Sequence, residues 1–421
     1  MVRKIVKGMV VFVFLGLAAV AAYIYFRVDN RVVVNSNRVA FENSLDVVRL
    51  DSVVLSADSI KKFVSRLMKA SNVQGLGISV LNQNGLVFQD YFGSKNVSEN
   101  GAFHPGVVWY AASLSKPLFA DMVLQLSEER LIHIDTPLYR YLKKPLPEYR
   151  TNFFDHLLGS QSIDYRALSE DDRYKKITAR MCLSHTTGLP NWRWLEPDKK
   201  LRIRFEPGSR YAYSGEGMFL LQFVLEEVLG KDIEQIAVER EFIPLRMTIS
   251  SFVWQRSYEE NYVVGHDASS NNLRIPKFNT SNGAGSLSTT LEEYTTFFQK
   301  VLQQGIPRYR EMIAPQVRIF SRQQFGPEAD QTTSENDSIQ LSYGLGFGLY
   351  EGRCGRAFFK EGHLEGWQHY VVGFPDHGFG LVLMSNSDQA ESIFKELVTF
   401  LSGDESMPWY WEGYIPYDQK Q

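Results

Sequence analysis

The sequence predicts an α+β fold in which an antiparallel sheet, built from N- and C-terminal strands, is flanked by helices, with an inserted mainly helical lobe. Strand-like runs lie near both ends of the chain, and the long stretch between them shows mostly helical periodicity. The chain has 421 residues, of which 44% are hydrophobic and 13% aromatic. This is enough material for a large core and excludes a disordered protein.

The N-terminal segment, residues 1–27, is predicted to be a transmembrane anchor or a signal segment. Three basic residues precede an uncharged run over residues 9–26, which as a helix would be about 27 Å long and could span a bilayer. The basic flank favours export of the rest of the chain. We expect an anchor in a bacterial inner membrane, with the catalytic domain in the periplasm or outside the cell. The alternative is a secreted protein, because residues 19–21 resemble a signal cleavage site.

The remainder of the chain divides into three parts by composition. Residues 28–57 are polar and β-branched without clear periodicity and are interpreted as a linker. Residues 58–405 are predicted to form the main domain, with the helical lobe at about 117–275. Residues 406–421 form a tail that contains two tryptophans and three tyrosines, and such aromatic side chains usually pack on their parent domain.

The first elements of the main domain are a helix and a hairpin. The helix runs over about 58–70 and is capped by the aspartate at its start. Strands over 76–81 and 86–92 flank Asn84-Gly85, which is the strongest short signal for a hairpin. Two strands so early in the chain predict the edge of a sheet.

The middle of the chain is predominantly helical. A helix with one apolar side runs from Ser113 to about Leu131, and others cover 177–185 and 217–229, the last ended by Gly230. The remaining elements are a helix that opens at a capping box over 290–293 and ends at Gly305, strands over 370–374 and 381–385, and a helix over 389–401.

Charge, cysteines and motifs argue against several classes of protein. The chain has 45 basic and 48 acidic residues, so nothing favours nucleic acid as a partner. Cys182 and Cys354 show no metal-ligand spacing. Cys182 lies among apolar helical positions and is predicted to be a buried free thiol, although an exported protein could pair the two. The Gly-x-Ser-x-Gly and His-Glu-x-x-His motifs are absent, and we expect no metal or cofactor.

A serine and a lysine three residues apart lie on the same face of a helix. This pattern occurs three times, at Ser59/Lys62, Ser113/Lys116 and Ser392/Lys395. The first and third pairs fall in amphipathic helices, where both residue types are ordinary on the surface. Ser113 opens a helix whose N-terminal dipole favours a developing anion. Lys116, if desolvated, would have a lowered pKa and accept the serine proton; the alternative is a capping serine beside a solvated lysine.

Taken together with Leu183-Ser-His-Thr-Thr-Gly-Leu-Pro190, the Ser113-Leu-Ser-Lys116 motif resembles the β-lactamase-related serine hydrolases. This family includes class C β-lactamases, D-alanyl-D-alanine carboxypeptidases and esterases with a penicillin-binding-protein-like fold. The resemblance runs from about Val73 to Leu401 and includes several motifs in the same order. It implies the β-lactamase/transpeptidase-like fold.

The resemblance also implies a third catalytic residue. In Tyr211-Ala-Tyr213-Ser-Gly215, Tyr213 matches the family's catalytic tyrosine, which would move protons between the serine, the lysine and the leaving group. Gly215 lies in the substrate site where the family has asparagine. An amide that in relatives would contact a substrate carbonyl is therefore missing, and this argues against β-lactam chemistry.

The family's Lys-Thr-Gly motif has no direct match. A Gly-His-x-x-Gly variant, found in esterase-like members, resembles the segment that contains His363 and Gly366. On that resemblance His363 is favoured over Lys360 for the strand position in the site. The backbone N–H groups of Ser113 and of a residue near Gln368 would form the oxyanion hole.

The sequence therefore predicts a serine hydrolase that cleaves an ester or amide, in a small molecule or a peptide, through an acyl-enzyme on Ser113. One alternative is a D-alanyl-D-alanine carboxypeptidase or β-lactamase acting at the cell wall. Another, from a different class, is a catalytically inactive, membrane-anchored binding protein with the same fold.

Overall fold

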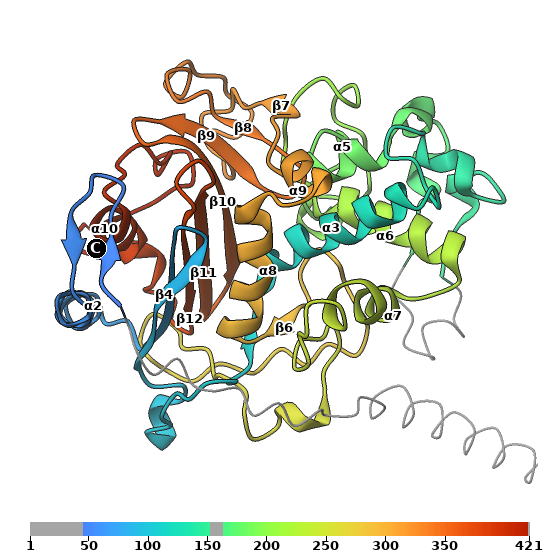
Figure 1. Ribbon diagram of the computed structural model, residues 1–421. Helices are drawn as coiled ribbons and strands as arrows, with labels where there is room; N and C mark the ends of the chain where they lie inside the picture. Colours follow the sequence, from blue (N-terminus) through green and yellow to red (C-terminus); the bar gives the residue numbers. More distant parts are fainter. Residues whose placement is uncertain (1–44, 152–162, 420–421) are drawn as a thin grey trace, which may run out of the picture.

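The computed structural model describes residues 45–151 and 163–419 (Figure 1). The predicted anchor and the first part of the predicted linker lie outside the described residues. Within those two ranges, none of the helices has the length and apolar character needed to span a bilayer.

The centre of the molecule is an eight-stranded antiparallel sheet. Its strand order is β4-β3-β12-β11-β10-β9-β8-β7, so strands from the two ends of the chain meet at the β3–β12 pair, as predicted. The strands of this sheet are β3 (Gly75–Asn82), β4 (Gly85–Gly93), β7 (Val317–Arg318), β8 (Ser342–Tyr343), β9 (Gly348–Gly352), β10 (Gly355–Leu364), β11 (Trp367–Phe374) and β12 (Phe379–Ser385). Two small sheets pair β1 (Val47–Val48) with β2 (Val54–Leu55), and β5 (Trp109–Tyr110) with β6 (Ser288–Thr289).

Helices cover both faces of the sheet (Figure 1). Helices α2 and α10 pack on one face, while α8 packs on β3 and β12 from the other face and separates the sheet from the helical lobe. The helices are α2 (Ala57–Ser71), α3 (Ser115–Glu128), α5 (Ala179–Leu183), α6 (Gly215–Leu229), α7 (Ile233–Ala237), α8 (Leu291–Gln303), α9 (Pro307–Met312) and α10 (Glu391–Ser402).

Two hydrophobic cores form on the two faces of the sheet. Successive side chains of a strand point to opposite faces, and accordingly Phe358 belongs to the core beneath the helical lobe and Phe359 to the core beneath α2 and α10. The aromatic tail closes the second core, with Trp411 1% exposed and the ring of Trp409 5.3 Å from that of Tyr370. The tail is therefore an integral part of the domain.

Most of the predicted elements are confirmed, with changes at their ends. The hairpin around Asn84 forms the sheet edge as predicted. The first helix is capped by Ser56 and not by the predicted aspartate, because the serine oxygen accepts the N–H of Ser59. Residues 47–55 of the predicted linker contain β1 and β2. Both cysteines are free thiols, as predicted for Cys182.

Candidate active site

Ser113 lies in a single 3₁₀ turn, Ala112–Leu114, that leads directly into α3. Ala112 has a φ of 48°, a left-handed conformation that is uncommon for a residue with a side chain and that is concentrated at functional sites. The hydroxyl of Ser115 donates to the carbonyl of Ala112 at 2.6 Å and holds this conformation. The surrounding structure thus fixes the turn that carries the serine at the start of α3.

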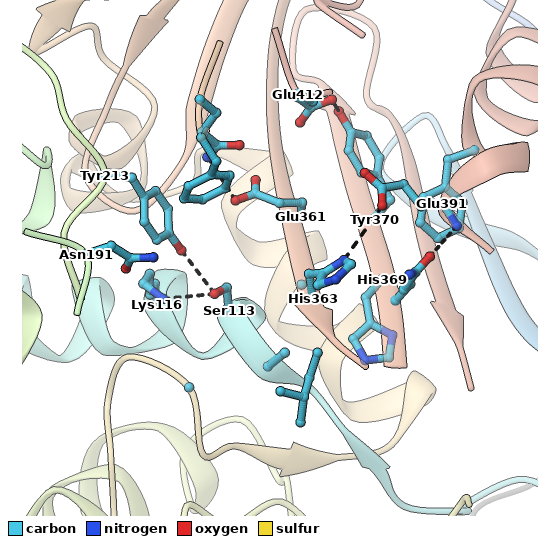
Figure 2. A pocket seen from close by; sticks show the side chains of 18 of the residues that line it. Ser113, Lys116, Asn191, Tyr213, Glu361, His363, His369, Tyr370, Glu391 and Glu412 are labelled. Carbon is cyan, nitrogen blue, oxygen red and sulfur yellow. Dashed lines mark hydrogen bonds and ion pairs between the residues drawn. The ribbon is translucent and has the colours of Figure 1, made fainter. Parts of the chain in front are cut away.

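Two side chains converge on the serine hydroxyl (Figure 2). The Nζ of Lys116 donates to Ser113 Oγ at 2.9 Å, and the hydroxyl of Tyr213 donates to the same oxygen at 3.0 Å. Lys116 is held by a second hydrogen bond of 2.6 Å to the carbonyl of Ala284. The structure therefore brings together the three residues that the sequence nominated for catalysis.

The environment of Lys116 favours its neutral form. Its side chain is 1% exposed, and this burial lowers the pKa of the ammonium. The nearby Tyr213 acts in the opposite direction, while the positive charge of Lys360 adds to the lowering. A lysine with a lowered pKa is better able to accept the serine proton.

This lowered pKa predicts how acylation depends on pH. The rate at which Ser113 reacts with a fluorophosphonate is expected to rise with pH as Lys116 loses its proton, with a midpoint below the ordinary lysine value of about 10.4. Intact mass measured against time at a series of pH values, corrected for hydrolysis of the reagent, gives the profile. A rate that still increases above pH 10 would contradict a buried, neutral lysine.

His185 packs beneath the tyrosine and is not itself a reacting group. Its ring centroid lies 4.2 Å from that of Tyr213, and its Nδ1 accepts the N–H of Ser214 at 3.1 Å. Complete burial holds the pKa of His185 well below its usual value, so the ring is neutral. Its position indicates that this histidine has a structural role.

The structure places Lys360, and not His363, beside the tyrosine. The Nζ of Lys360 lies 5.0 Å from the centre of the Tyr213 ring. His363 is three positions further along β10, and an odd separation on a strand puts two side chains on opposite faces. Its ring lies instead 3.7 Å from Glu391 and is 57% exposed. His363 lines the catalytic cavity, as expected for a substrate-binding residue, whereas Lys360 is buried beside Tyr213.

The triplet Lys360-Glu361-Gly362 occupies the strand next to the nucleophile. Burial opposes the charge of Lys360, but Glu361, whose carboxylate lies 2.5 Å from the ammonium, together with Tyr213 raises the pKa of Lys360 above its ordinary value. A Cβ on Gly362 would lie 2.8 Å from the carbonyl oxygen of Ala111. Glycine is therefore needed for β10 to approach the nucleophile turn so closely.

The sequence nominated two further residues for the site, Gly366 and Gln368. Gly366 is in the β10–β11 turn, where its N–H donates to Asp388 at 2.7 Å, and it is not among the residues that line the cavity. Gln368 lines the cavity, but its side chain is bound by the loop before α10. Its backbone pairs with His363 on one side and with Ser385 on the other.

Gly215 is the first residue of α6, and its surroundings explain why no side chain is present. A Cβ there would lie 2.4 Å from the ring of Trp192. Its N–H donates to the side-chain oxygen of Asn191 at 3.2 Å. The space that an asparagine side chain would need at position 215 is thus filled by the loop that follows α5.

The catalytic groups open into a cavity of about 440 Å³ between the helical lobe, the sheet and the C-terminal tail. Its lining includes groups that sequence reasoning missed: Asn191, Glu361, Glu391, Trp409 and Glu412. None of these five residues belongs to a motif that the sequence analysis used. Within the described residues, no cluster of three metal-binding side chains is present.

A nucleophile turn between a helical lobe and an antiparallel sheet, with a buried lysine and a tyrosine on the serine oxygen, defines a serine hydrolase. The chain belongs to the Beta-lactamase family, whose sequence profile matches residues 60–400.

Several characterised proteins are similar to this chain. The D-alanyl-D-alanine-carboxypeptidase/endopeptidase AmpH of Escherichia coli is 23% identical over 84% of this chain and 91% of its own length. The teichoic acid D-alanine hydrolase of Staphylococcus aureus is 22% identical, and the match covers 60% of this chain and 63% of that protein. The chain is thus related to D-alanine carboxypeptidases.

Solved structures show the same fold. The octameric penicillin-binding protein homologue from Pyrococcus abyssi superposes with a TM-score of 0.64 at 16% identity, over 85% of this chain and 80% of that chain. A β-lactamase/D-alanine carboxypeptidase from Yersinia pestis gives a TM-score of 0.60 at 18% identity, over 82% and 99%. At these identities the likeness concerns the fold, and it confirms the predicted β-lactamase/transpeptidase-like architecture.

Proposed function

We propose that the protein hydrolyses an ester or amide through an acyl-enzyme on Ser113, with Lys116 and Tyr213 as the proton-transfer groups. The observation that carries this proposal is the pair of hydrogen bonds, 2.9 and 3.0 Å long, that the lysine and the tyrosine make to one serine oxygen. Such a hydroxyl lies within reach of a base and of a second proton carrier.

The reaction follows from this arrangement in two halves. Neutral Lys116 takes the proton of Ser113 as Oγ forms a bond to the substrate carbonyl carbon. The bond to the leaving group then breaks, and Tyr213 delivers a proton to the departing oxygen or nitrogen while it is reprotonated from Lys116. In the second half, water attacks the acyl carbon, its proton passes to the same pair, and Ser113 Oγ leaves with a proton.

We further propose a D-alanyl ester or amide as the substrate. The names of two relatives, one from Staphylococcus aureus and one from Escherichia coli, both refer to D-alanine.

The proposed cellular location of the protein rests on the sequence of residues 1–27. The basic flank and apolar run of that segment support a bacterial inner-membrane anchor with the catalytic domain exported, or a secreted enzyme if the segment is removed. Membrane association of the full-length chain, compared with a chain that begins at Val28, tests this proposal.

A fluorophosphonate is expected to add once to the purified full-length chain, and the adduct is expected to be absent from a Ser113→Ala variant. The reagent reacts with activated serines. Intact mass measures the adduct, and peptide mapping locates it. Ser59→Ala is the matched control, because Ser59 has the same spacing to a lysine but does not line the cavity. This variant is expected to react like the parent chain.

The result also decides between the enzyme and the inactive binding protein. An adduct on Ser113 justifies a comparison of D-alanyl esters, D-alanyl peptides and β-lactams as substrates. Folded protein that forms no adduct over the pH range in which Lys116 titrates would refute the hydrolase proposal and favour the binding protein.

A further inference from the structure

The start of α6 is held by the loop that precedes it. The first N–H groups of a helix have no partner within the helix. Here the N–H of Gly215 donates to Asn191 Oδ1 at 3.2 Å, and the N–H of Glu216 donates to the backbone oxygen of Asn191 at 3.0 Å. The N–H of Gly217 donates to Ser214 Oγ at 2.9 Å. One asparagine therefore satisfies two of the N–H groups at this helix end.

These bonds fix which way the side-chain amide of Asn191 points. A backbone N–H requires an oxygen acceptor, so the oxygen of the amide must face Gly215 and the NH₂ group must face away. Asn191 lines the catalytic cavity together with Ser113 and Tyr213, and Figure 2 shows its nitrogen on the side of Tyr213. The NH₂ group makes no hydrogen bond to the described residues. It is an oriented donor at the wall of the cavity.

The loop that carries Asn191 is held rigidly. Arg193, two residues after Asn191, forms a 2.6 Å ion pair with the buried carboxylate of Glu216. The backbone N–H of Arg193 donates to the same carboxylate at 2.9 Å. Trp192 stacks on Trp194, with ring centroids 4.7 Å apart. Because Trp192 fills the space over Gly215, the donor on this wall comes from the loop and not from the helix.

We propose that Asn191 is a specificity-determining residue that donates a hydrogen bond from Nδ2 to an acceptor oxygen in the acyl part of the substrate. The matching chemistry is an acyl group that carries a carbonyl or hydroxyl oxygen close to the scissile carbonyl, such as an acylamino group on the adjacent carbon. Because the donor is already oriented, little conformational entropy is lost when it binds the substrate. It therefore favours a substrate with such an oxygen over one with an alkyl group at the same place. This inference rests on the proposed function, because it assigns the acyl side of the same site.

Two fluorophosphonates of similar shape test the inference. In one, phosphorus carries a 1-acetamidoethyl group, and in the other an isopropyl group. The measured quantity is the ratio of their acylation rate constants at Ser113, each divided by the rate of hydrolysis of the reagent in buffer. In the parent chain the acetamido reagent is expected to be favoured about three- to tenfold, the usual contribution of one hydrogen bond.

Two variants of Asn191 distinguish its hydrogen-bond donation to the substrate from its role as acceptor at the start of α6. Asn191→Asp retains the oxygen that accepts from Gly215 but removes the donor, and Asn191→Ala removes both without adding charge. Both are expected to bring the ratio close to one. A ratio that is near one in the parent chain, or unchanged in Asn191→Ala, would overturn this inference while an adduct on Ser113 still supports the hydrolase. The absence of any adduct with either reagent would overturn both.

Discussion

Replacing Lys116 with methionine is expected to slow acylation of Ser113 by about 10³-fold, which lies within the range contributed by a positioned general base. The lysine amine is 2.9 Å from the serine oxygen and is completely buried. Methionine has a similar volume and no charge, so the variant is expected to remain folded. Intact mass after timed exposure to a fluorophosphonate gives the rate constant, and thermal melting checks the fold.

Lys62→Met provides the matched control, because Lys62 has the same spacing to a serine and lies exposed on α2. It is expected to react at the parent rate. A parent-like rate in Lys116→Met would show that another group accepts the serine proton.

Replacing Arg308 with methionine is expected to lower the free energy of unfolding by about 3 kcal/mol, as when one partner of a buried ion pair is removed. Arg308 Nε lies 2.5 Å from a carboxylate oxygen of Asp121, whose side chain is 0% exposed. Glu241 is also buried and is coupled electrostatically to Asp121. Without the guanidinium, two buried carboxyl groups lose the positive charge that compensates them.

This loss of stability is expected to depend on pH. Burial already raises the pKa of Asp121 above its usual value, against the effect of Arg308, and removal of Arg308 raises it further. A carboxyl group whose pKa is higher in the folded state destabilises that state as pH rises above the unfolded value of about 4. The variant should therefore differ little from the parent chain near pH 4 and differ most near pH 7.

Urea unfolding followed by circular dichroism at several pH values measures both effects. Arg353→Met is the control, because the Arg353–Glu405 pair is exposed and such pairs contribute little; its midpoint is expected to match the parent. If the urea midpoint of Arg308→Met at pH 7 equalled that of the parent chain, the carboxyl groups of Asp121 and Glu241 would both be neutral and would need no positive partner.

Local sequence patterns predicted the secondary structure well where one residue type decides it. Asn84-Gly85 predicted the hairpin, and Gly230 predicted the end of α6. Helix starts were less certain, because a serine and an aspartate two positions apart can both cap a helix, and Ser56 rather than the aspartate does so. Short strands such as β1 and β7 gave no periodic signal, since two residues are too few to show one.

The candidate site was predictable in part. Ser113 and Lys116 lie one helical turn apart, so their proximity follows from local geometry. Tyr213 lies 100 residues further along the chain, and only its resemblance to a family motif pointed to it. No sequence motif pointed to Asn191. Its role depends on which end of its side-chain amide binds the N-terminus of α6, and this helix begins more than twenty residues later in the chain.

The sequence by itself determined the α+β class, the joining of strands from both ends, and the serine–lysine pair, because these depend on periodicity, turn residues and spacing along one segment. Tertiary structure alone decided which face of β10 meets the nucleophile, and therefore that Lys360 rather than His363 lies beside Tyr213. It also decided that the C-terminal tail lines the cavity. Strand faces and cavity walls are set by packing between distant segments, which local sequence does not encode.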